Sequence, residues 1–576
     1  MPTISHWRLS NNNSTGEERL AAELGINHLI SQILINRNIE TPDEAKKFLF
    51  PSLKDLHNPF LLKDMDKGVN RVIDAIVRGQ KITVYGDYDA DGITSTVILV
   101  KFLKECYDNV AFYIPDRIKE GYGLNTGAID MIKKDGTQLI LTVDCGISNH
   151  KEIDHASLLG IDTVVLDHHE VPDTLPRAIA AINPYRKDSV FPFRPLAGVG
   201  VVFNFLIALR GTMRNRGFWE DRPYPNLKTY LDLVALGTIG DMMPLVDENR
   251  IFTKIGLSII EHDSRIGLKA LKLVSGLENS VIDSESAAFK IIPRINAAGR
   301  VGSPYDAVKL LLSDDFKESL MMAERLDLYN SQRQEIEKAI VTELREKIDS
   351  ESDLAARNCF VFSSNRWHPG VIGIVASKLV ERYYRPTVLI SIKDGIGKGS
   401  ARSIAEYNLY EGLESKCSPL LLSYGGHRYA AGISIREEDI LDFSRLLNEA
   451  VESDIGDTHP IPQTLIDAEC TFGDIDFNLL SQIEMLAPFG NMNPEPIFCA
   501  KDIFVTSHTT VGNNHLRMSL SDNATGYDSI WFNRGGLFGS LDGSRVDIAF
   551  TPQLNRWKGT SNIQLKIKDL SIKLAS

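Results

Sequence analysis

Residues 81–106 read KITVYGDYDADGITSTVILVKFLKEC and decide how the chain folds. The short apolar run KITVY predicts a buried strand, and the apolar spacing between Val97 and Leu103 predicts a buried helix after it. Three aspartates, Asp87, Asp89 and Asp91, stand in the turn that joins the two. We therefore expect a strand–turn–helix unit with a dense negative charge at its turn.

Three further strand candidates follow this unit along the chain. They are residues 110–114, 138–144 and 163–167, separated by polar or helical segments. Short apolar strands that alternate with helices favour a parallel sheet covered on both faces. The sequence thus predicts an α/β domain, and the apolar segments of residues 196–275 predict more helices beside it.

The rest of the chain predicts three more parts. Residues 306–350 have helical spacing, many charges and no proline or glycine, which indicates a long helix that connects two lobes. A second α/β pattern begins with CFVFSS at 359–364. From about residue 462 short strands and turns alternate, which is typical of a small β-barrel such as an OB fold.

The composition excludes several classes of protein. The chain has 576 residues, 43% of them hydrophobic and 24% charged, and a net charge of −13, which is typical of globular rather than disordered or fibrous proteins. Such a length suggests about three or four domains. No apolar run approaches the ~18 residues of a membrane span, and the N-terminus carries no secretory signal pattern. The six cysteines are scattered without a CxxC pair, so we expect reduced cysteines in a cytoplasmic protein.

Metal-type ligands stand at the ends of the predicted strands. Asp144 follows LILTV, Asp167, His168 and His169 follow TVVL, and a further acid, Asp241, follows the apolar run LVALGTIG. Because ligands of α/β sheets bind at the carboxyl ends of the strands, we expect these side chains to converge with the aspartates of the first turn. Carboxylates so close together repel one another unless a cation compensates them. The mix of carboxylate and imidazole suits Mn²⁺ or Mg²⁺ better than zinc.

Each of these features also has a plain structural explanation. The DxDxDG pattern of the first turn resembles a calcium-binding loop or a solvated turn, although Ile98 occupies the position at which an EF-hand needs a glutamate. A His-His pair is often structural, and Asp144 could cap the helix that follows it. The joint occurrence of the three features at successive strand ends favours a metal site.

An acidic protein that handles nucleic acid has to concentrate its positive charge. Between Arg357 and Arg402 eight basic residues stand against two acidic ones. Those at helical spacing are typical of a solvated helix face. The segments GKGSAR and SYGGH differ, because their glycines let backbone N–H groups approach an anion, and Ser400, Arg402 and His427 stand beside these glycines.

The motifs of this chain resemble those of a known family. VYGDYDADGITST, LTVDCG, LDHH and GTIGDMMPL are similar to the four ordered motifs of the DHH phosphoesterase superfamily. Within that superfamily, PRINAAGR (293–300), RWHPGVIGIVASKL (366–379), GKGSARS (397–403) and SYGGHRYAAG (423–432) resemble the RecJ-type single-strand-specific exonucleases. The resemblance covers about residues 50 to 576.

The resemblance implies a multidomain α/β protein. Its parts would be a parallel-sheet DHH domain and a DHHA1-type α/β domain joined by a long helix, with a C-terminal OB-like β-barrel. The expected boundaries are residues 1–55 for an N-terminal helical segment, 56–305 for the DHH catalytic domain, 306–350 for the connecting helix, 351–455 for the phosphate- and DNA-binding DHHA1 domain and 456–576 for an OB fold that binds single-stranded DNA.

The resemblance also implies a site for two ions, Mn²⁺ or Mg²⁺. The ligands carried over from the family motifs are Asp87, Asp89, Asp91, Asp144, His168 and Asp241. Asp144 would bridge the ions, His169 would contact the scissile phosphate and Asp167 would orient its neighbours, as residues behind metal ligands do. The expected catalytic residues are therefore Asp144, Asp167, His168 and His169. The expected contacts to DNA phosphates are Arg117, Arg294, His368, Ser400, Arg402 and His427.

The implied activity is the hydrolysis of single-stranded DNA from its 5′ end, with release of 5′-mononucleotides, in DNA recombination and repair. A single-strand-binding protein and a RecQ-type helicase are the implied partners, and a cytoplasmic monomer without membrane contact is expected. Two alternatives stay open. One is a DHH phosphodiesterase that acts on short oligoribonucleotides, cyclic dinucleotides or pyrophosphate, and the other is a non-catalytic DNA-replication subunit. The complete ligand set speaks against the non-catalytic subunit.

The C-terminal strands offer candidates for stacking nucleobases. The aromatic residues Trp531, Phe532 and Trp557 stand near Arg517, Arg534 and Arg556. OB barrels bind single strands on such aromatics beside a positive groove. Phe532 and one of the tryptophans are nevertheless expected in the barrel core.

Overall fold

The computed structural model describes residues 6–10, 14–262, 264–355, 357–456, 460–512, 514–536, 541–557 and 560–572. The chain forms two compact units. The sheet unit comprises His57–Met243 and Ile255–Pro460, and the barrel unit comprises Met1–Leu56, Pro244–Lys254 and Ile461–Ser576. Each unit has hydrophobic cores of its own.

A five-stranded parallel sheet forms the first half of the sheet unit. Its strands are β2 (Lys81–Tyr85), β3 (Val110–Tyr113), β4 (Thr137–Val143), β5 (Asp162–Leu166) and β6 (Ala180–Ile182). They lie in the order β3-β2-β4-β5-β6, and all neighbouring pairs are parallel. The predicted parallel sheet is confirmed, and β6 adds a short strand that the sequence did not reveal.

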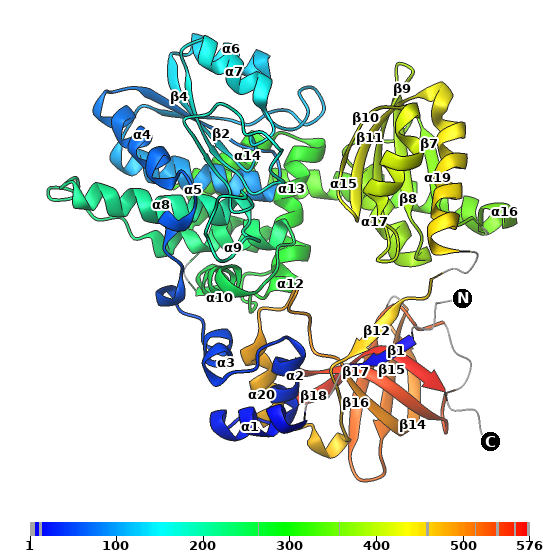
Figure 1. Cartoon of the computed structure of the whole chain (residues 1–576). Helices are drawn as coiled ribbons and strands as arrows, with labels where there is room; N and C mark the ends of the chain where they lie inside the picture. Colours follow the sequence, from blue (N-terminus) through cyan, green and yellow to red (C-terminus); the bar gives the residue numbers. More distant parts are fainter. Residues whose placement is uncertain are drawn as a thin grey trace. The chain divides into compact units, whose positions relative to one another are not determined.

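Helices cover both faces of this sheet (Figure 1). They are α4 (Met65–Val77), α5 (Ala90–Cys106), α6 (Thr126–Lys134), α7 (His150–Leu158) and α8 (Gly198–Asn215). On one face, Ile129 of α6 joins Ile140 of β4 in one apolar cluster, to which α7 also contributes. On the other face α4 approaches the sheet closely, since a Cβ on Gly68 would lie 3.3 Å from Val164 of β5. Helix α5 is buried along most of its length, as its apolar spacing predicts.

The sheet unit continues as a run of helices. They are α9 (Leu231–Gly240), α10 (Asp247–His262), whose first turns belong to the barrel unit, α11 (Ile266–Val274), α12 (Ser284–Ser286), the π-helix η4 (Ala287–Ile291), α13 (Ile292–Val301), α14 (Pro304–Leu312) and α15 (Phe316–Ser350). The prediction of one helix over 306–350 is wrong at its start. The chain is extended at Ser313, and Asp315 then caps α15 by accepting a hydrogen bond from Glu318 N–H at 2.7 Å. A side chain that caps a new helix in this way separates it from the helix before it.

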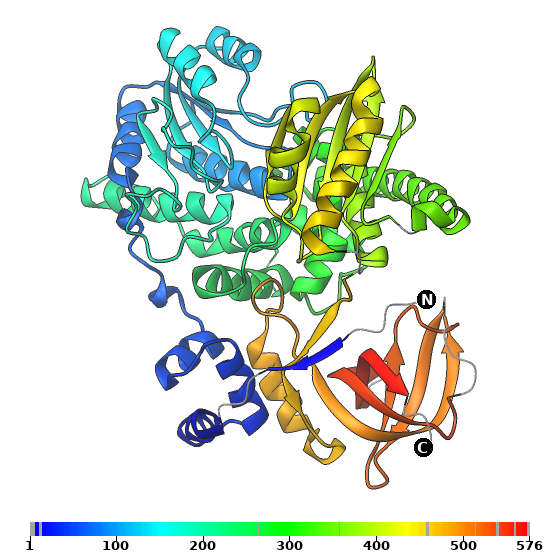
Figure 2. The ribbon, with the colours of Figure 1, turned by 45° about the vertical axis from the view of Figure 1, so that its right-hand side comes forward.

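A second, mixed sheet forms the other half of the sheet unit. It consists of β7 (Phe360–Ser364), β8 (Thr387–Lys393), β9 (Ile396–Arg402), β10 (Leu421–Gly426) and β11 (Ala430–Arg436), in the order β10-β11-β9-β8-β7, and the helices around it are α16 (Ser352–Ala355), α17 (Ile372–Tyr383), α18 (Leu409–Gly412) and α19 (Ile440–Ile455). Figure 2 shows α19 along the sheet. Phe443 of α19 packs with Val388 of β8, whereas Val375 of α17 packs with the neighbouring Leu389. Adjacent strand residues point to opposite faces, so the two helices cover opposite sides.

A closed five-stranded barrel dominates the barrel unit. Its strands are β14 (Phe498–Val511), β15 (His515–Ser521), β16 (Gly526–Trp531), β17 (Arg545–Trp557) and β18 (Thr560–Ile572). They follow the order β14-β15-β16-β18-β17, and pairing of β17 with β14 closes the ring. The predicted OB-like barrel is confirmed.

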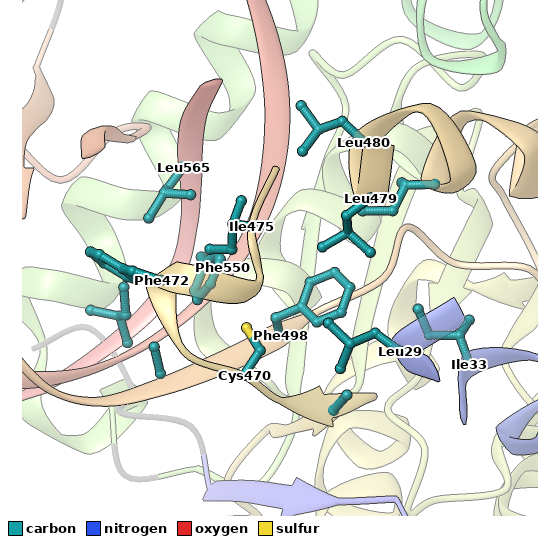
Figure 3. Close-up of a cluster of buried hydrophobic side chains, with 14 of the residues drawn as sticks. Leu29, Ile33, Cys470, Phe472, Ile475, Leu479, Leu480, Phe498, Phe550 and Leu565 are labelled. Atoms are coloured by element: carbon teal, nitrogen blue, oxygen red, sulfur yellow. The ribbon is translucent and has the colours of Figure 1, made fainter. Parts of the chain in front are cut away.

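One core joins the barrel to the helices that precede it in the chain. The remaining elements are α1 (Ser14–Leu24), α2 (His28–Asn36), α3 (Pro42–Leu49), α20 (Phe477–Leu486) and the short strands β1 (His6–Leu9), β12 (Gln463–Ile466) and β13 (Ala468–Glu469). Leu29 of α2, Leu479 of α20 and Phe498 of β14 belong to the same buried cluster (Figure 3). The segment 1–55 is therefore not purely helical. Strand β1 pairs with β12, because Trp7 packs on the barrel unit and its indole N–H donates to Asp569 at 2.8 Å.

All six cysteines are buried and none forms a disulfide, as their scatter in the sequence predicts. In the part of the chain that the structure describes, no helix combines the length and the apolar character that a membrane span requires.

A buried arginine connects two helix ends within the barrel unit. Arg250 is 1% exposed, and its guanidinium lies on the ring of Phe48. It donates hydrogen bonds of 2.7 to 3.1 Å to the backbone carbonyls of Phe48, Met485, Leu486 and Ala487. These groups end α3 and α20, where carbonyls have no partner within their own helix and a positive charge is favourable.

We expect Arg250→Ala to lower the free energy of unfolding by about 3 kcal/mol or more, because each buried carbonyl that loses its donor costs about 1–3 kcal/mol. Thermal unfolding of the purified variant measures the effect. Arg19 of the same unit is exposed, so Arg19→Ala should leave the melting temperature almost unchanged. Equal melting temperatures for the two variants would contradict the structural role of Arg250.

Candidate metal centre and phosphate site

The start of α5 places three aspartates at the carboxyl end of β2. Asp87 and Asp91 are buried, and Asp89 is partly exposed. Asp89 is the N-cap of α5, and its carboxylate accepts hydrogen bonds from the N–H groups of Asp91 at 2.9 Å and Gly92 at 3.1 Å. The turn is thus held by the local geometry of a helix start, and its acids point away from the sheet core into a common site.

Asp91 also fixes the position of α8. Its two carboxylate oxygens accept hydrogen bonds from the N–H groups of Gly198 at 2.7 Å and Val199 at 2.8 Å, the first residues of that helix. A side chain could not stand at position 198, because a Cβ there would lie 2.8 Å from Oδ1 of Asp144. The N-terminus of α8 therefore lies against two acids, whose negative charge its dipole favours.

Asp144 follows β4 in a conformation that is uncommon for aspartate. Its φ of +59° lies in the left-handed region, its N–H donates to the carbonyl of Leu166 at 3.0 Å, and its carbonyl accepts from the Tyr122 hydroxyl at 3.1 Å. This bend brings its Oδ1 to 3.1 Å from Nε2 of His168. The alternative role of Asp144 as a helix cap is excluded, because α7 begins only at His150.

Asp167 holds the two histidines in place. Its Oδ1 accepts from the N–H groups of His168 and His169 and lies 2.7 Å from Nδ1 of His169, while its Oδ2 accepts from Ile147 N–H. Burial raises the pKa of Asp167, but the hydrogen bond and charge of His169, the charge of His168 and the hydrogen bond from Ile147 N–H together lower it to about 2. Burial lowers the pKa of His169, but the same bond, together with the charges of Asp167, Asp241 and Asp89, raises it to about 9. Burial, and then the charge of His169, lowers the pKa of His168 to about 4.

Six side chains from four segments of the chain converge into two triads. They are Asp87, Asp89 and Asp144 in one triad and Asp91, His168 and Asp241 in the other, with ligand atoms within 4.8 Å of one another in each. Asp241, at the end of α9, reaches His168 Nε2 at 3.5 Å. A third group, which contains Asp144, His168 and His169, overlaps both triads. All the side chains expected as metal ligands therefore lie together.

The carboxylates of this cluster need a compensating cation. Burial, and then repulsion by neighbouring acids, raises the pKa of Asp87, Asp144 and Asp241 well above the usual range and that of Asp91 to about 7. Within the described residues, Oδ1 of Asp87, Oδ1 of Asp144 and Nε2 of His168 are buried without a hydrogen-bond partner of acceptable geometry. Buried polar atoms are costly unless something binds them. Oxygen ligands with one imidazole nitrogen fit Mn²⁺ or Mg²⁺.

A positive cluster adjoins Asp87. The guanidinium of Arg117 lies over the Tyr88 ring, 4.9 Å from its centroid, and its charge lowers the pKa of Asp87 against the larger effect of burial. Burial, and then the charge of Arg117, lowers the pKa of both His368 and Arg402. The charge of Arg117 thus reaches two further predicted phosphate contacts, His368 and Arg402.

Ser400 and Arg402 of β9 meet the start of α17. Arg402 Nη1 donates to Ser400 Oγ at 3.3 Å, and a Cβ at Gly373 would lie 2.8 Å from that oxygen. Helix N-termini attract phosphate groups through their free N–H groups and dipole. Arg300, which the sequence reasoning missed, belongs to the same cluster and donates to the carbonyl of Gly370 at 2.9 Å. The signal that could have found it is its place as the last residue of PRINAAGR.

Two predicted phosphate contacts have acidic partners. Arg294 donates to Asp327 of α15 at 2.8 Å and to the carbonyl of Lys290, so its guanidinium connects α13 with α15. His427 lies 3.4 Å from the carboxylate of Glu170 and lines a cavity of about 820 Å³. Arg294 is thus paired with an acid of α15, and His427 with Glu170.

Tyr122 is a further site residue that the sequence reasoning missed. Its hydroxyl lies 3.1 Å from Nδ1 and 3.2 Å from Nε2 of His169, in addition to its bond with Asp144. The signal in the sequence is the pair of glycines that flank it, Gly121 and Gly123, because both have a positive φ and so shape the loop.

The aromatic candidates of the barrel differ in exposure. Trp531 lies in the barrel core, as expected for one of the tryptophans. The prediction that Phe532 is also buried is wrong, because β16 ends at Trp531 and the chain turns there, which leaves Phe532 44% exposed. Arg534 lies over the Trp531 ring. The side chains of Arg556 and Trp557 lie outside the described residues.

Three family models match the chain in the order of its domains. The model of the DHH family, N-terminal domain, matches residues 81–238, that of the DHHA1 domain matches 356–453 and that of the RecJ OB domain matches 466–569. The parallel sheet with its convergent acids, the mixed sheet and the barrel thus define a multidomain protein of the DHH class.

Individual relatives make this assignment more specific. The single-stranded-DNA-specific exonuclease RecJ of Bacillus subtilis (strain 168) is 36% identical over 571 residues, which cover 98% of this chain and 71% of that protein. The protein of the same name from Escherichia coli (strain K12) is 34% identical over 556 residues, 94% of this chain and 95% of that one. The crystal structure of RecJ from Thermus thermophilus in complex with Mn²⁺ has a TM-score of 0.84 at 29% identity, over 99% of this chain and 80% of that one. The chain belongs to the RecJ family.

Removal and return of a divalent ion should change the stability of the sheet unit. We expect Mn²⁺ to raise the melting temperature of protein stripped with EDTA, because an ion that binds only the folded chain stabilises it by about 2.7 kcal/mol at 100 times its dissociation constant. Asp144→Ala should lose this increase. Asp173→Ala, which changes an exposed aspartate, should keep it. An equal increase in both variants would remove Asp144 from the ligand set.

Asp167→Asn should lower activity by about 10–100-fold, the range typical of residues behind metal ligands. The substitution keeps the shape of the side chain but takes away the negative charge that His169 faces. Because His169 then loses the partner that raises its pKa, the imidazole pKa measured by NMR should fall from about 9 toward its ordinary value. An unchanged His169 pKa would contradict the role given to Asp167.

Proposed function

We propose that this chain is a single-stranded-DNA-specific exonuclease that hydrolyses phosphodiester bonds with two divalent ions, Mn²⁺ or Mg²⁺. The observation that carries the proposal is the pair of ligand triads beside the positive cluster. Relatives that are named single-stranded-DNA-specific exonucleases support the choice of substrate. Solved RecJ structures in complex with Mn²⁺ and with Mg²⁺ support the choice of ions.

The two triads would hold the two ions, and Asp144 is proposed, on the family resemblance, as a ligand that both ions would share. When bound, the ions would lower the pKa of a water molecule and stabilise negative charge on the attacked phosphate. His169 is half-exposed and would donate a hydrogen bond to a phosphate oxygen. Asp167 would act as a positioning residue that keeps the ring of His169 in place.

The positive cluster is the proposed site of a DNA phosphate. Arg117, His368, Ser400 and Arg402 would hold it beside the ions, and contacts of this kind fix position without reading base sequence. His427 would contact DNA from the cavity side. Arg294 would first have to release Asp327.

Several finer features are proposed from the family alone. They are cleavage from the 5′ end, release of 5′-mononucleotides, a role in DNA recombination and repair, cooperation with a single-strand-binding protein and a RecQ-type helicase, a monomeric state and a cytoplasmic location. The proposed domain boundaries assign catalysis to residues 56–305, phosphate binding to 351–455 and the holding of single-stranded DNA to 456–576.

One assay separates this function from its two alternatives. Mn²⁺-dependent digestion of 5′- and 3′-labelled single-stranded DNA is compared with that of duplex DNA, short RNA, cyclic dinucleotides and pyrophosphate. We expect the first labelled product to come from the 5′ end of single-stranded DNA. Hydrolysis of only the small substrates would favour a DHH phosphodiesterase. Hydrolysis of none would favour a non-catalytic replication subunit, against which the complete ligand set speaks.

Asp144→Ala should reduce the cleavage of single-stranded DNA by more than about 100-fold, since loss of a ligand should exceed the 10–100-fold effect of residues behind ligands. DNA binding, measured by fluorescence anisotropy, should stay close to that of the parent because the positive cluster is intact. Asp173→Ala is again the exposed control. Near-normal turnover by Asp144→Ala would exclude Asp144 from the reaction.

Arg402→Ala should raise KM about tenfold on every sequence, because it removes a charged hydrogen-bond donor to phosphate. It should also reduce the salt slope of DNA binding by about one. Arg382→Ala changes an exposed arginine of the same domain and should alter neither quantity. A salt slope that Arg402→Ala leaves unchanged would place Arg402 away from the DNA.

A further inference from the structure

A cavity of about 820 Å³ opens beside the metal centre. Its walls come from both halves of the sheet unit, and it reaches Asp167 and His169. The volume lies in the range of about 300–1,000 Å³ typical of small-molecule sites. The cavity is therefore large enough to hold a nucleotide.

Tyr122 offers an aromatic surface to this cavity. It is 51% exposed, yet its hydroxyl is fixed by the bonds to Asp144 and His169. The backbone on both sides is set by Gly121 and Gly123, with φ of +85° and +81°. The ring is thus both accessible and held in one orientation.

Hydrogen bonds to the neighbouring Glu120 hold the loop that carries Tyr122 in place. The carboxylate of Glu120 accepts hydrogen bonds from the Tyr113 hydroxyl at 2.7 Å, from Asn125 Nδ2 at 3.0 Å and from Asp116 N–H at 2.7 Å. A platform that is rigid before binding loses little conformational entropy when a ligand stacks on it.

The other lining residues combine charged groups, among them Glu170, Glu411 and Arg428, with groups that suit the flat face and polar edges of a nucleobase. Tyr410 contributes a second aromatic ring, and Gly425 and Gly426 leave room for a planar group to approach the backbone. Asn149 and Asn408 offer amide groups. The arginines of the positive cluster do not line the cavity, so phosphate and base would be held by different groups around the metal centre.

We propose that this cavity is a nucleobase site, which takes the base of the 5′-terminal nucleotide that is released, with Tyr122 as its stacking platform. The inference rests on the proposed exonuclease function and adds the part of the substrate that the cavity recognises. Stacking on an aromatic ring accepts every base, because each base has a flat π-face. The site would therefore favour the presence of a base without selecting its identity.

The test compares two 5′-phosphorylated single strands that differ only in the terminal nucleotide, which is either normal or abasic. In the parent enzyme the terminal base should raise kcat/KM about tenfold, within the range that aromatic stacking supplies. Tyr122→Ala should abolish this difference. Tyr122→Phe keeps the ring and loses only the hydroxyl, so it should preserve the difference even if kcat falls. Tyr224→Ala, which changes an exposed tyrosine outside the cavity lining, should behave as the parent does.

Equal kcat/KM for the normal and the abasic strand in the parent would overturn the proposal, and so would a difference that persists in Tyr122→Ala. If neither strand is cleaved by the parent, the exonuclease function fails instead, so the two failures are distinct. A terminal 2-aminopurine gives a second readout: its fluorescence should be quenched on binding to Asp144→Ala and not to Asp144→Ala with Tyr122→Ala. If Tyr122→Ala does not fold, Tyr122→Leu, which fills more of the space of the ring but cannot stack, replaces it in both measurements, and a base effect and quenching that both persist would then overturn the proposal.

Discussion

Repulsion among carboxylates that are buried at one edge of a parallel sheet is the constraint on which the rest of this structure depends. Asp87, Asp91 and Asp144 are each at most 3% exposed, and they belong to neighbouring groups of ligand atoms. The chain offsets part of this repulsion itself, by directing the N–H groups at the start of α8 toward Asp91. The remaining repulsion between the carboxylates, and the buried ligand atoms without a hydrogen-bond partner, favour the binding of cations at this site.

The charges of the sheet unit are arranged so that an acidic protein can receive a polyanion. The acids of the metal centre are grouped together and mostly buried. A positive cluster around Arg117 and Arg402 lies next to Asp87. The cavity beside His169 is lined by tyrosines, amides and glycines together with the ionisable residues Glu170, Glu411 and Arg428. Phosphate, reacting centre and base would thus meet surfaces of different character, which explains why the net charge of the whole chain says little about its substrate.

The sequence indicated which acids and which imidazole converge, because each of them follows a recognisable strand or apolar helix. The sequence did not distinguish Arg294 from Arg300, which belong to one motif. In the structure Arg294 pairs with Asp327 of α15, whereas Arg300 lies within reach of the charges of Arg117 and Arg402. Phe532 was expected in the core, but β16 ends at Trp531 and the chain turns there, which leaves Phe532 exposed. Tyr122 has no motif of its own and enters the site only through a loop that Glu120 braces.

The sequence by itself determined the chemistry of the site and the classes of fold. The alternation of short apolar strands with helices specifies a parallel sheet. Because the carboxyl ends of parallel strands share one edge, this local pattern is sufficient to predict that the acids at the strand ends lie together. Only the tertiary structure decided how the ligands divide into two triads, that Asp91 also holds α8, and which basic and aromatic groups stand around the centre. These relations join segments far apart in the chain, and the distances between such segments are set by packing, which no local pattern encodes.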